Sequence, residues 1–344
     1  MNIRQQTEET ERLILHPKAA RAAESKGRLA PEKEGTIRTA YQRDRDWILH
    51  SKAFRRLKHK TQVFLAPEGD HYRTRLTHTL EVSQIARTIA RALRLNEDLT
   101  EAVALGHDLG HTPFGHAGEA VLNKIHKGGF NHYEQSLRVV DAIEKGGRGL
   151  NLTHEVRNGI LMHSKGKGRI FPGGGKGMAE TLEGQVVRVA DGIAYTNHDL
   201  DDALRAKVLK PADIPKEISS LLGTSHSRRI DTMVKDVIYA SLDGGLSGIR
   251  MGGEISAATE EMRKFLFAKV YESERMQSEH DKAAKVLTEL YNRFLDPKMP
   301  LPVREVAHED EDRSRLVCDF VAGMTDRYAI NLYNELFMPS PWEA

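Results

Sequence analysis

The chain contains a single cysteine, Cys318, among its 344 residues. One thiol excludes an internal disulfide framework and any metal site built from several thiolates of this chain. The sequence also lacks a run of about 18 or more apolar residues, so no transmembrane helix is expected. These absences favour a reducing compartment, and we expect a cytoplasmic protein with no membrane partner.

The chain also lacks an excess of charge of one sign, because its 51 Lys and Arg residues are nearly balanced by 49 Asp and Glu residues. The bulk charge therefore does not require a polyanionic partner. Residues 1–12 are polar and carry three glutamates, which is not the pattern of a signal peptide. A chain of this length with 39% hydrophobic residues has enough apolar material for one large domain or two.

Strand patterns are scarce, and apolar residues recur mostly at the three- and four-residue spacing of helices. The sequence therefore predicts a mainly α fold. We expect an N-terminal arm over 1–35, a core with the functional site over 36–205, and a helical C-terminal region over 206–344.

Histidines are abundant, and the densest group lies in 104–116, where three histidines accompany one aspartate: His107, Asp108, His111 and His116. Imidazole and carboxylate together suit a borderline divalent metal. Adjacent residues on a helix point in different directions, and glycines and a proline interrupt this stretch. We therefore predict a helix end that runs into a tight loop lined by these four side chains.

Two flanking helices are placed to bring a further histidine to this loop. His78 lies four residues before Val82 on one apolar stripe, and His107 lies four residues beyond Val103 on the next. A lone histidine in such a position is more commonly a hydrogen-bonded core residue. The two helices packed together would nevertheless bring His78 to the His107–Asp108 pair.

The stretch 181–204 predicts a long, largely buried helix with a polar line along it. Asp191, Tyr195 and Asp199 recur every four residues among Val, Ala and Ile. A buried carboxylate costs several kcal/mol unless it is paired or bound to a metal. A salt bridge to an arginine is the structural alternative, and we place metal or ligand binding slightly ahead of it.

Two more acidic or imidazole side chains fall near the histidine loop. Glu119 lies three residues after His116, so a helix places both on one face, where the carboxylate can orient the imidazole. His132 stands near the start of the following helix, where a capping or surface histidine is the alternative.

Basic residues precede His78 in two groups. Arg73 and Arg75 lie just before its helix, where either a phosphate site or ordinary surface arginines are consistent with the sequence. The run 55–60 is either a solvated helix face or a polyanion contact. The glycine-rich stretch 146–178 lacks the spacing of a phosphate-binding P-loop and predicts a flexible loop or lid.

The set His78, His107-Asp108 and Asp191 matches the pattern of the HD superfamily of metal-dependent phosphohydrolases. Longer segments resemble the bacterial deoxyguanosinetriphosphate triphosphohydrolase-like proteins, over roughly 36–338. These segments are His107-Asp-Leu-Gly-His-Thr-Pro-Phe-Gly-His116, Ser51-Lys-Ala-Phe-Arg-Arg-Leu-Lys-His-Lys-Thr-Gln-Val-Phe64, Phe130-Asn-His-Tyr-Glu-Gln-Ser-Leu137, Leu182-Glu-Gly-Gln-Val-Val-Arg-Val-Ala-Asp-Gly-Ile-Ala-Tyr195 and Phe320-Val-Ala-Gly-Met-Thr-Asp-Arg-Tyr328. The resemblance implies an HD-domain helical bundle with a helical C-terminal extension.

The resemblance also implies an activity, in which a dNTP and water give a deoxynucleoside and inorganic triphosphate. The residues that match the family's metal ligands are His78, His107, Asp108 and Asp191. Those that match its catalytic and phosphate-contacting positions are His111, His116, Glu119 and His132, with Arg73 as a phosphate-binding arginine. Those that match its deoxyribose contacts are Gln62, Tyr195 and Asp199.

The implied cofactor is a divalent metal, Mn²⁺ or Mg²⁺, with Fe, Co, Ni and Zn as the other ions that the ligands allow. A metal acidifies bound water, so hydroxide formed there, or activated by the His116–Glu119 pair, would attack the α-phosphorus. The family further implies a homo-oligomer, tetramer or hexamer. It leaves room for an activating nucleotide and for single-stranded DNA at the basic run 55–60.

Two other functions stay open on the sequence. One is an HD phosphohydrolase that acts on a nucleoside monophosphate, a cyclic dinucleotide or a guanosine alarmone. The other is a nucleotide- or DNA-binding regulator without turnover.

Overall fold

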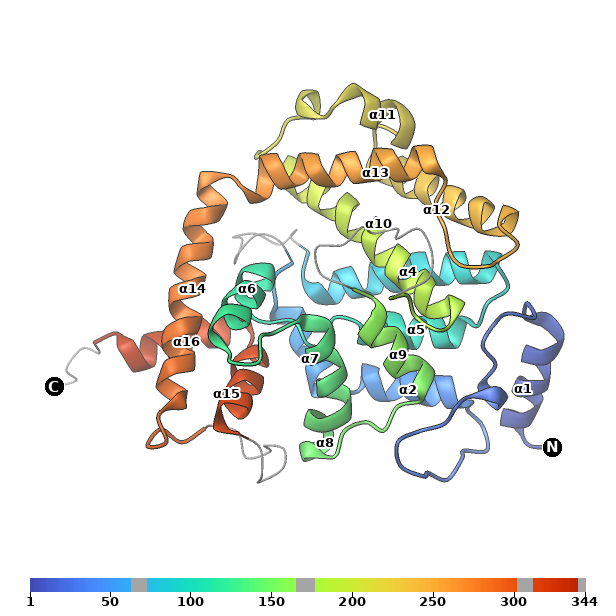
Figure 1. Ribbon diagram of the computed structural model, residues 1–344, viewed down its shortest axis with the longest axis horizontal. Coiled ribbons are helices and arrows are strands. Elements are labelled where there is room, and N and C mark those ends of the chain that lie inside the picture. Colours follow the sequence, from blue (N-terminus) through green and yellow to red (C-terminus); the bar gives the residue numbers. More distant parts are fainter. Residues whose placement is uncertain (63–72, 165–176, 302–311, 340–344) are drawn as a thin grey trace. The chain divides into compact units, whose positions relative to one another are not determined.

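The computed structural model describes residues 1–62, 73–164, 177–301 and 312–339 (Figure 1). These residues form helices and no strand, and their only extended pairings are two isolated bridges, Arg28 with Thr153 and Thr61 with Thr74. The predicted mainly α fold is confirmed. Within the described ranges, no helix combines the length and the apolar content that crossing a bilayer requires. The glycine-rich stretch 146–178 was expected to be a flexible loop or lid, but within it His154–Met162 form helix α9, because Val156 and Ile160 are buried in the core; residues 165–176 of this stretch lie outside the described residues.

The chain divides into two compact units, each assembled from separate stretches of sequence. The first contains Met1–His50, Thr77–His107 and Asn151–Ser273, and the second contains Ser51–Leu76, Asp108–Leu150 and Glu274–Ala344. The His107–Asp108 peptide is one of the points at which the chain passes from one unit to the other. The boundaries expected after residues 35 and 205 stay a prediction.

The first unit is built around α10 (Leu182–Arg205), the longest helix of this unit. Around it lie α1 (Ile3–Ile14), η1 (Ala22–Glu24), α2 (Ala40–Leu49), α4 (Arg75–Ala92, whose first two residues belong to the second unit), α5 (Glu97–Gly106), α9 (His154–Met162), η4 (Pro211–Asp213), α11 (Lys216–Leu222), α12 (His226–Asp243), α13 (Gly253–Leu266) and η5 (Phe267–Tyr271). Helix α10 packs against α5, α9, α12 and α13 (Figure 1). Its long buried face, predicted from 181–204, therefore forms the centre of this unit.

The ends of helix α5 match the capping signals in its sequence. The Asn96 side chain accepts a hydrogen bond from the Leu99 amide at 3.1 Å, and two acidic residues follow in the first turn. The helix ends at Gly106, next to His107. The predicted helix terminus before the histidine loop is confirmed.

The N-terminal arm contains one α-helix, α1, among its described residues. Helix α1 ends at Ile14, and the following residues are held by buried carboxylates. Glu11 accepts a hydrogen bond from the Ala22 amide at 2.8 Å, and Glu183 accepts from the amides of Ala20 and Asn96 at 2.9 and 3.0 Å. Burial raises the pKa of the Glu183 carboxyl to about 7, against these hydrogen bonds.

The second unit has its apolar core around α14. Its helices are α3 (Lys52–Arg56), η2 (Leu57–His59), α6 (Gly115–Ile125), α7 (His132–Arg138), η3 (Val139–Ile143), α8 (Glu144–Gly147), α14 (Glu274–Leu295), α15 (Arg313–Ala322) and α16 (Asp326–Phe337). Helix α14 packs against α6, α15 and α16 (Figure 1). Leu287, Phe294 and Val321 lie in the core between these helices, as does the lone thiol of Cys318.

Candidate metal centre

Three predicted ligands of the first unit converge from three helices. His78 comes from α4, His107 follows the last residue of α5, and Asp191 comes from α10. Asp191 Oδ1 lies 3.1 Å from His78 Nε2 and 3.8 Å from His107 Nε2. The two imidazole rings are 5.8 Å apart between centroids. The predicted approach of His78 to His107 is therefore confirmed.

The outer nitrogen of each imidazole is held by the protein. His107 Nδ1 lies 2.6 Å from the carbonyl oxygen of Ala104, so it carries the proton and Nε2 is the basic nitrogen. His78 Nδ1 lies 3.3 Å from His198 Nδ1, and His198 Nε2 lies 3.0 Å from a carboxylate oxygen of Glu81. The His78 ring is thereby held from behind by His198, and its Nε2 faces Asp191.

This donor set fits a divalent metal. Two imidazole nitrogens and a carboxylate oxygen lie close together, and each imidazole is oriented from behind, as in protein metal sites. Nitrogen and carboxylate ligands together suit borderline ions such as Mn²⁺, Fe²⁺ and Zn²⁺. His198 was not singled out from the sequence, because a lone histidine on an apolar helix gives no such signal.

The second unit holds its own group of potential ligands. One ligand atom each from Asp108, His111 and His132 lies within 4.8 Å of the other two. His111 Nε2 is 3.1 Å from Asp108 Oδ1, and the His111 and His132 rings stack at 4.0 Å between centroids. Burial lowers the pKa of His111, and the charges of Arg75 and His132 lower it further. His111 Nδ1 is buried without a hydrogen-bond partner among the described residues.

Arg75 is the largest fully buried polar residue beside this group. Its Nη1 donates to Asp108 Oδ2 at 2.8 Å, while Nε and Nη2 have no hydrogen-bond partner in the described part of the chain. A buried guanidinium with two unused donors is suited to bind an anion. The family resemblance assigned this role to Arg73, which is partly buried, and that assignment stays a prediction.

Glu119 joins two of the predicted catalytic histidines. Its Oε1 lies 2.9 Å from His132 Nδ1, and its Oε2 lies 3.5 Å from Nδ1 of the exposed His116. Burial alone raises the pKa of Glu119, but the charge of His132 and the hydrogen bonds of both histidines outweigh it and hold the pKa well below its usual range. Glu119 is therefore an anion placed between two imidazole rings.

A glycine permits the close approach that brings His111 to His132. A Cβ atom at Gly110 would lie 2.1 Å from the amide nitrogen of Ser136 and 2.5 Å from the carbonyl oxygen of His132. The Gly110 amide instead donates to the Ser136 hydroxyl at 2.9 Å. Any side chain at this position would separate the histidine loop from the start of α7.

The residues predicted to contact deoxyribose lie in both units. In the first, the hydroxyl of Tyr271 donates to Asp199 Oδ2, and the Tyr195 and Tyr271 rings lie 15° from parallel with centroids 6.4 Å apart. Burial raises the pKa of Asp199 to about 7, although the Tyr271 hydrogen bond lowers it. Gln62 is buried in the second unit, where its Oε1 has no hydrogen-bond partner among the described residues. Tyr271 was missed because it lies 72 residues after Asp199.

The basic run 55–60 is divided by burial. Lys60 is 3% exposed, and its ammonium donates to the carbonyl oxygens of His111 and Ala322. Burial lowers the pKa of Lys60 to about 7, and the charge of Arg56 adds to this effect. Lys60 is therefore part of the interior, whereas Arg55, Arg56, Lys58 and His59 are exposed.

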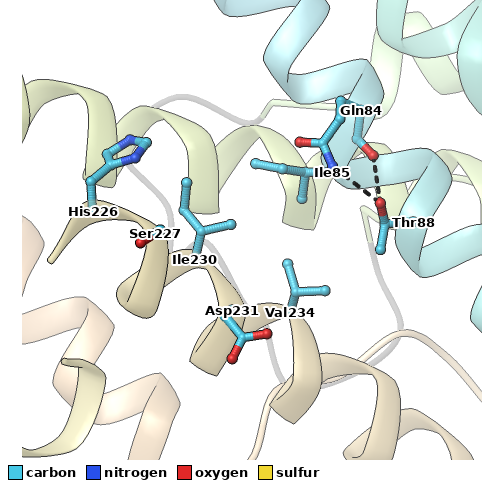
Figure 2. A pocket seen from close by; sticks show the side chains of 8 residues that line it. All are labelled: Gln84, Ile85, Thr88, His226, Ser227, Ile230, Asp231 and Val234. Atoms are coloured by element: carbon cyan, nitrogen blue, oxygen red, sulfur yellow. Dashed lines mark hydrogen bonds between the residues drawn. The ribbon is translucent and has the colours of Figure 1, made fainter.

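An open hollow on the first unit lies apart from the predicted site residues. It is lined by Ile85, Ile230 and Val234, with Gln84, Thr88, His226, Ser227 and Asp231 around them (Figure 2). The Gln84 amide donates to the Thr88 hydroxyl at 3.2 Å. His226 also stacks on His198, with ring centroids 5.8 Å apart. None of the predicted ligands or catalytic residues lines this hollow.

Comparisons with known proteins agree with these observations. A family model of the HD domain matches residues 75–196, and a model of the phosphohydrolase-associated domain matches residues 249–335. A protein of Caldanaerobacter subterraneus subsp. tengcongensis is 58% identical over 344 residues, which is 99% of this chain and 98% of the relative. Proteins of Desulfatibacillum aliphaticivorans and Clostridium tetani are 51% and 47% identical, covering 99% and 98% of this chain and 99% and 97% of their own lengths.

All three relatives are named deoxyguanosinetriphosphate triphosphohydrolase-like proteins. The matched HD domain spans His78, His107, Asp108 and Asp191, the four predicted ligands. The chain therefore belongs to the deoxyguanosinetriphosphate triphosphohydrolase-like family of HD-domain, metal-binding hydrolases.

Proposed function

We propose that the protein is a metal-dependent dNTP triphosphohydrolase. The oxygen of water bonds to the α-phosphorus, the bond from that phosphorus to the 5′ oxygen breaks, and a proton goes to the 5′ oxygen. The products are a deoxynucleoside and inorganic triphosphate. The observation that carries the proposal is the buried group Asp108, His111 and His132 beside Arg75, whose two unused donors suit a phosphate oxygen.

The metal would be held by His78, His107 and Asp191, together with Asp108, which follows His107 in the chain. A bound divalent cation supplies Lewis acidity toward phosphate oxygens and acidifies water. Mn²⁺ and Mg²⁺ are our first candidates, and Fe, Co, Ni and Zn ions are further ions to test.

The proton chemistry falls to the histidines around Glu119. Its carboxylate stabilises a protonated ring at His132 or His116, and such a ring is the donor that the leaving 5′ oxygen requires. His111 is held neutral by burial and by its charged neighbours, so it accepts a proton or binds phosphate through an N–H. Arg75, with Arg73 as predicted, would offset the negative charge of the triphosphate.

Selection of deoxyribose would fall to α10 and Gln62. Tyr195 is our candidate for the wall that excludes a 2′-hydroxyl, since it stacks against Tyr271 and is thereby held in place. Asp199, whose Oδ1 has no hydrogen-bond partner among the described residues, is suited to bond the 3′-hydroxyl. Gln62 would contribute a further polar contact to the sugar.

The test is incubation of the purified protein with each dNTP, singly and mixed, in the presence of Mn²⁺ or Mg²⁺. We expect chromatography to show deoxynucleoside and intact triphosphate, and both products to disappear in the His107→Ala/Asp108→Ala variant. Release of phosphate or pyrophosphate would contradict the proposal.

The two other functions give different outcomes in the same experiment. Turnover of a nucleoside monophosphate, a cyclic dinucleotide or a guanosine alarmone, with all dNTPs left intact, would identify a different HD phosphohydrolase. Nucleotide or DNA binding without any product would identify a regulator.

Three partner assignments belong to the same proposal. We expect a homo-oligomer, tetramer or hexamer, which light scattering measures directly. Activity that appears only in mixtures of dNTPs would indicate an activating nucleotide. Single-stranded DNA would bind the exposed residues of the basic run, Arg55, Arg56, Lys58 and His59, and its affinity should fall steeply with salt.

A further inference from the structure

Asp326 is a buried carboxylate that bonds two distant segments of the second unit. It is the first residue of α16 and is 5% exposed. Its Oδ2 accepts hydrogen bonds from the amide of Thr61, at 3.0 Å, and from the Thr61 hydroxyl. Its Oδ1 accepts from the amide of Phe114, at 3.0 Å. One carboxylate therefore uses each oxygen for a different segment.

The bond to Phe114 fixes the start of α6. Phe114 has a φ of 62°, in the left-handed region that a bulky residue avoids, and it caps α6 without a side-chain hydrogen bond of its own. Gly115 follows with a φ of +56°. The direction of α6 is set at these two residues, and α6 carries His116 and Glu119.

The bond to Thr61 fixes the segment before Gln62. A Cβ atom at Gly115 would lie 3.2 Å from both the Gln62 carbonyl oxygen and Arg75 Nη2, so this segment packs closely on the start of α6. The residue before Thr61, Lys60, donates to the carbonyl oxygens of His111 and Ala322.

The hydrogen bonds of Lys60 and of Asp326 both involve residues next to the turn between α15 and α16. Ala322 is the last residue of α15, and Asp326 is the first residue of α16. The turn that joins these helices therefore holds the histidine loop at two points, at the His111 carbonyl through Lys60 and at the Phe114 amide through Asp326.

We propose that Asp326 is a positioning residue of the proposed reaction. Its carboxylate holds the left-handed turn at Phe114, and so places His116 and Glu119, while it fixes Thr61 beside Gln62. The effect of Asp326 on catalysis rests on the proposed function. Its effect on the position of these segments does not, because it follows from the hydrogen bonds of the fold. It gives the α15–α16 turn, which lies in the matched phosphohydrolase-associated domain, a direct part in the site.

The test compares three variants of the full chain. Asp326→Asn keeps the size of the side chain but replaces one acceptor oxygen with an N–H donor, so one segment loses its bond. Thr61→Val removes only the hydroxyl donor. Val321→Ala is the matched control, because Val321 is fully buried in the same helix pair and bonds neither segment through its side chain.

The activity readout separates positioning from general destabilisation. Because misplacing reacting groups by about 1 Å costs up to about 100-fold in rate, we expect kcat of Asp326→Asn to fall at least about tenfold. Thr61→Val should raise KM for the dNTP with kcat within about twofold, and Val321→Ala should keep both constants. Equal losses of kcat in Asp326→Asn and Val321→Ala would overturn the proposal.

A second readout does not depend on the reaction. Hydrogen exchange followed by mass spectrometry should show faster exchange at 109–119 in Asp326→Asn, but not in Val321→Ala. Wild-type exchange at this segment in Asp326→Asn would overturn the positioning role. If the wild-type protein released no triphosphate from any dNTP, the proposed function would fail, while the exchange result would still decide the role of Asp326.

Discussion

Glu119 bonds His132 at two points, accepting from its backbone amide at 2.8 Å and lying 2.9 Å from its Nδ1. The ring of His132 is thereby fixed in direction, and its plane lies 13° from that of His111. The Glu119 carboxylate therefore sets the direction of the His132 ring on the face of His111.

The first prediction concerns this carboxylate. Glu119→Gln removes the anion that stabilises a protonated ring, so we expect kcat for dNTP hydrolysis to fall by about 100-fold or more. Steady-state kinetics on the folded variant measures this. The control is Glu134→Gln, an exposed glutamate near the start of the same helix as His132, which should keep wild-type kcat. Near-wild-type activity of Glu119→Gln would show that the Glu119 carboxylate and the histidine it bonds have no role in proton transfer.

The second prediction concerns metal affinity in the first unit. His198→Ala removes the ring that orients His78 from behind, and loss of such a partner weakens metal binding by about 10- to 100-fold. Calorimetric titration of metal-stripped protein with Mn²⁺ measures the change. Gln84→Ala, an exposed position on α4, is the control. Unchanged affinity in His198→Ala would show that His78 needs no such support.

The third prediction concerns the pH dependence of stability. Burial raises the pKa of Glu183 from 4.5 to about 7, so the folded state binds this proton more tightly than the unfolded state. The unfolding free energy then falls as pH rises from about 4.5 to 7, and the loss is complete above the folded pKa. Glu183→Gln removes this loss.

Urea unfolding at pH 5 and pH 8 measures this effect. We compare the unfolding free energy of Glu183→Gln with that of the wild type at each pH. The variant's advantage should be about 2 kcal/mol larger at pH 8 than at pH 5. Glu254→Gln, at an exposed position on α13, is the control and should show no such difference. An equal effect of Glu183→Gln at both pH values would mean that the carboxyl is already ionised in the folded protein at pH 5.

The fourth prediction concerns the sugar. Tyr195→Ala should lower the preference for dNTP over NTP, measured as the ratio of kcat/KM values, by about tenfold or more, because an open 2′ position no longer rejects a hydroxyl. The control is Tyr239→Ala, a tyrosine 64% exposed on α12. An unchanged ratio in Tyr195→Ala would assign the 2′ discrimination to another residue.

Local spacing was enough to predict that the side chains of His78, His107 and Asp191 are directed into the interior, where the structure brings them together. His78, His107 and Asp191 each lie at a helical interval from a buried apolar residue, so the pattern that buries the helix also directs the ligand inward. The loop after Gly106 followed equally well from glycine and proline within the histidine stretch.

The residues that the sequence did not reveal are those whose role depends on burial or on distant contacts. Arg75 and Arg73 look alike in sequence, and only packing shows that Arg75 lies buried on Asp108. Lys60 lies in a basic run that is typical of a protein surface, yet its side chain is buried. Tyr271 and Asp326 meet their partners across 72 and 212 or more residues of chain, which no local pattern encodes.

The measurement that tests the account most directly is product analysis in ¹⁸O-labelled water by mass spectrometry, with a dNTP and Mn²⁺ or Mg²⁺. Water attack at the α-phosphorus predicts one ¹⁸O atom in intact triphosphate and none in the deoxynucleoside. Label in the deoxynucleoside, or phosphate and pyrophosphate in place of triphosphate, would contradict a triphosphohydrolase that acts at the α-phosphorus.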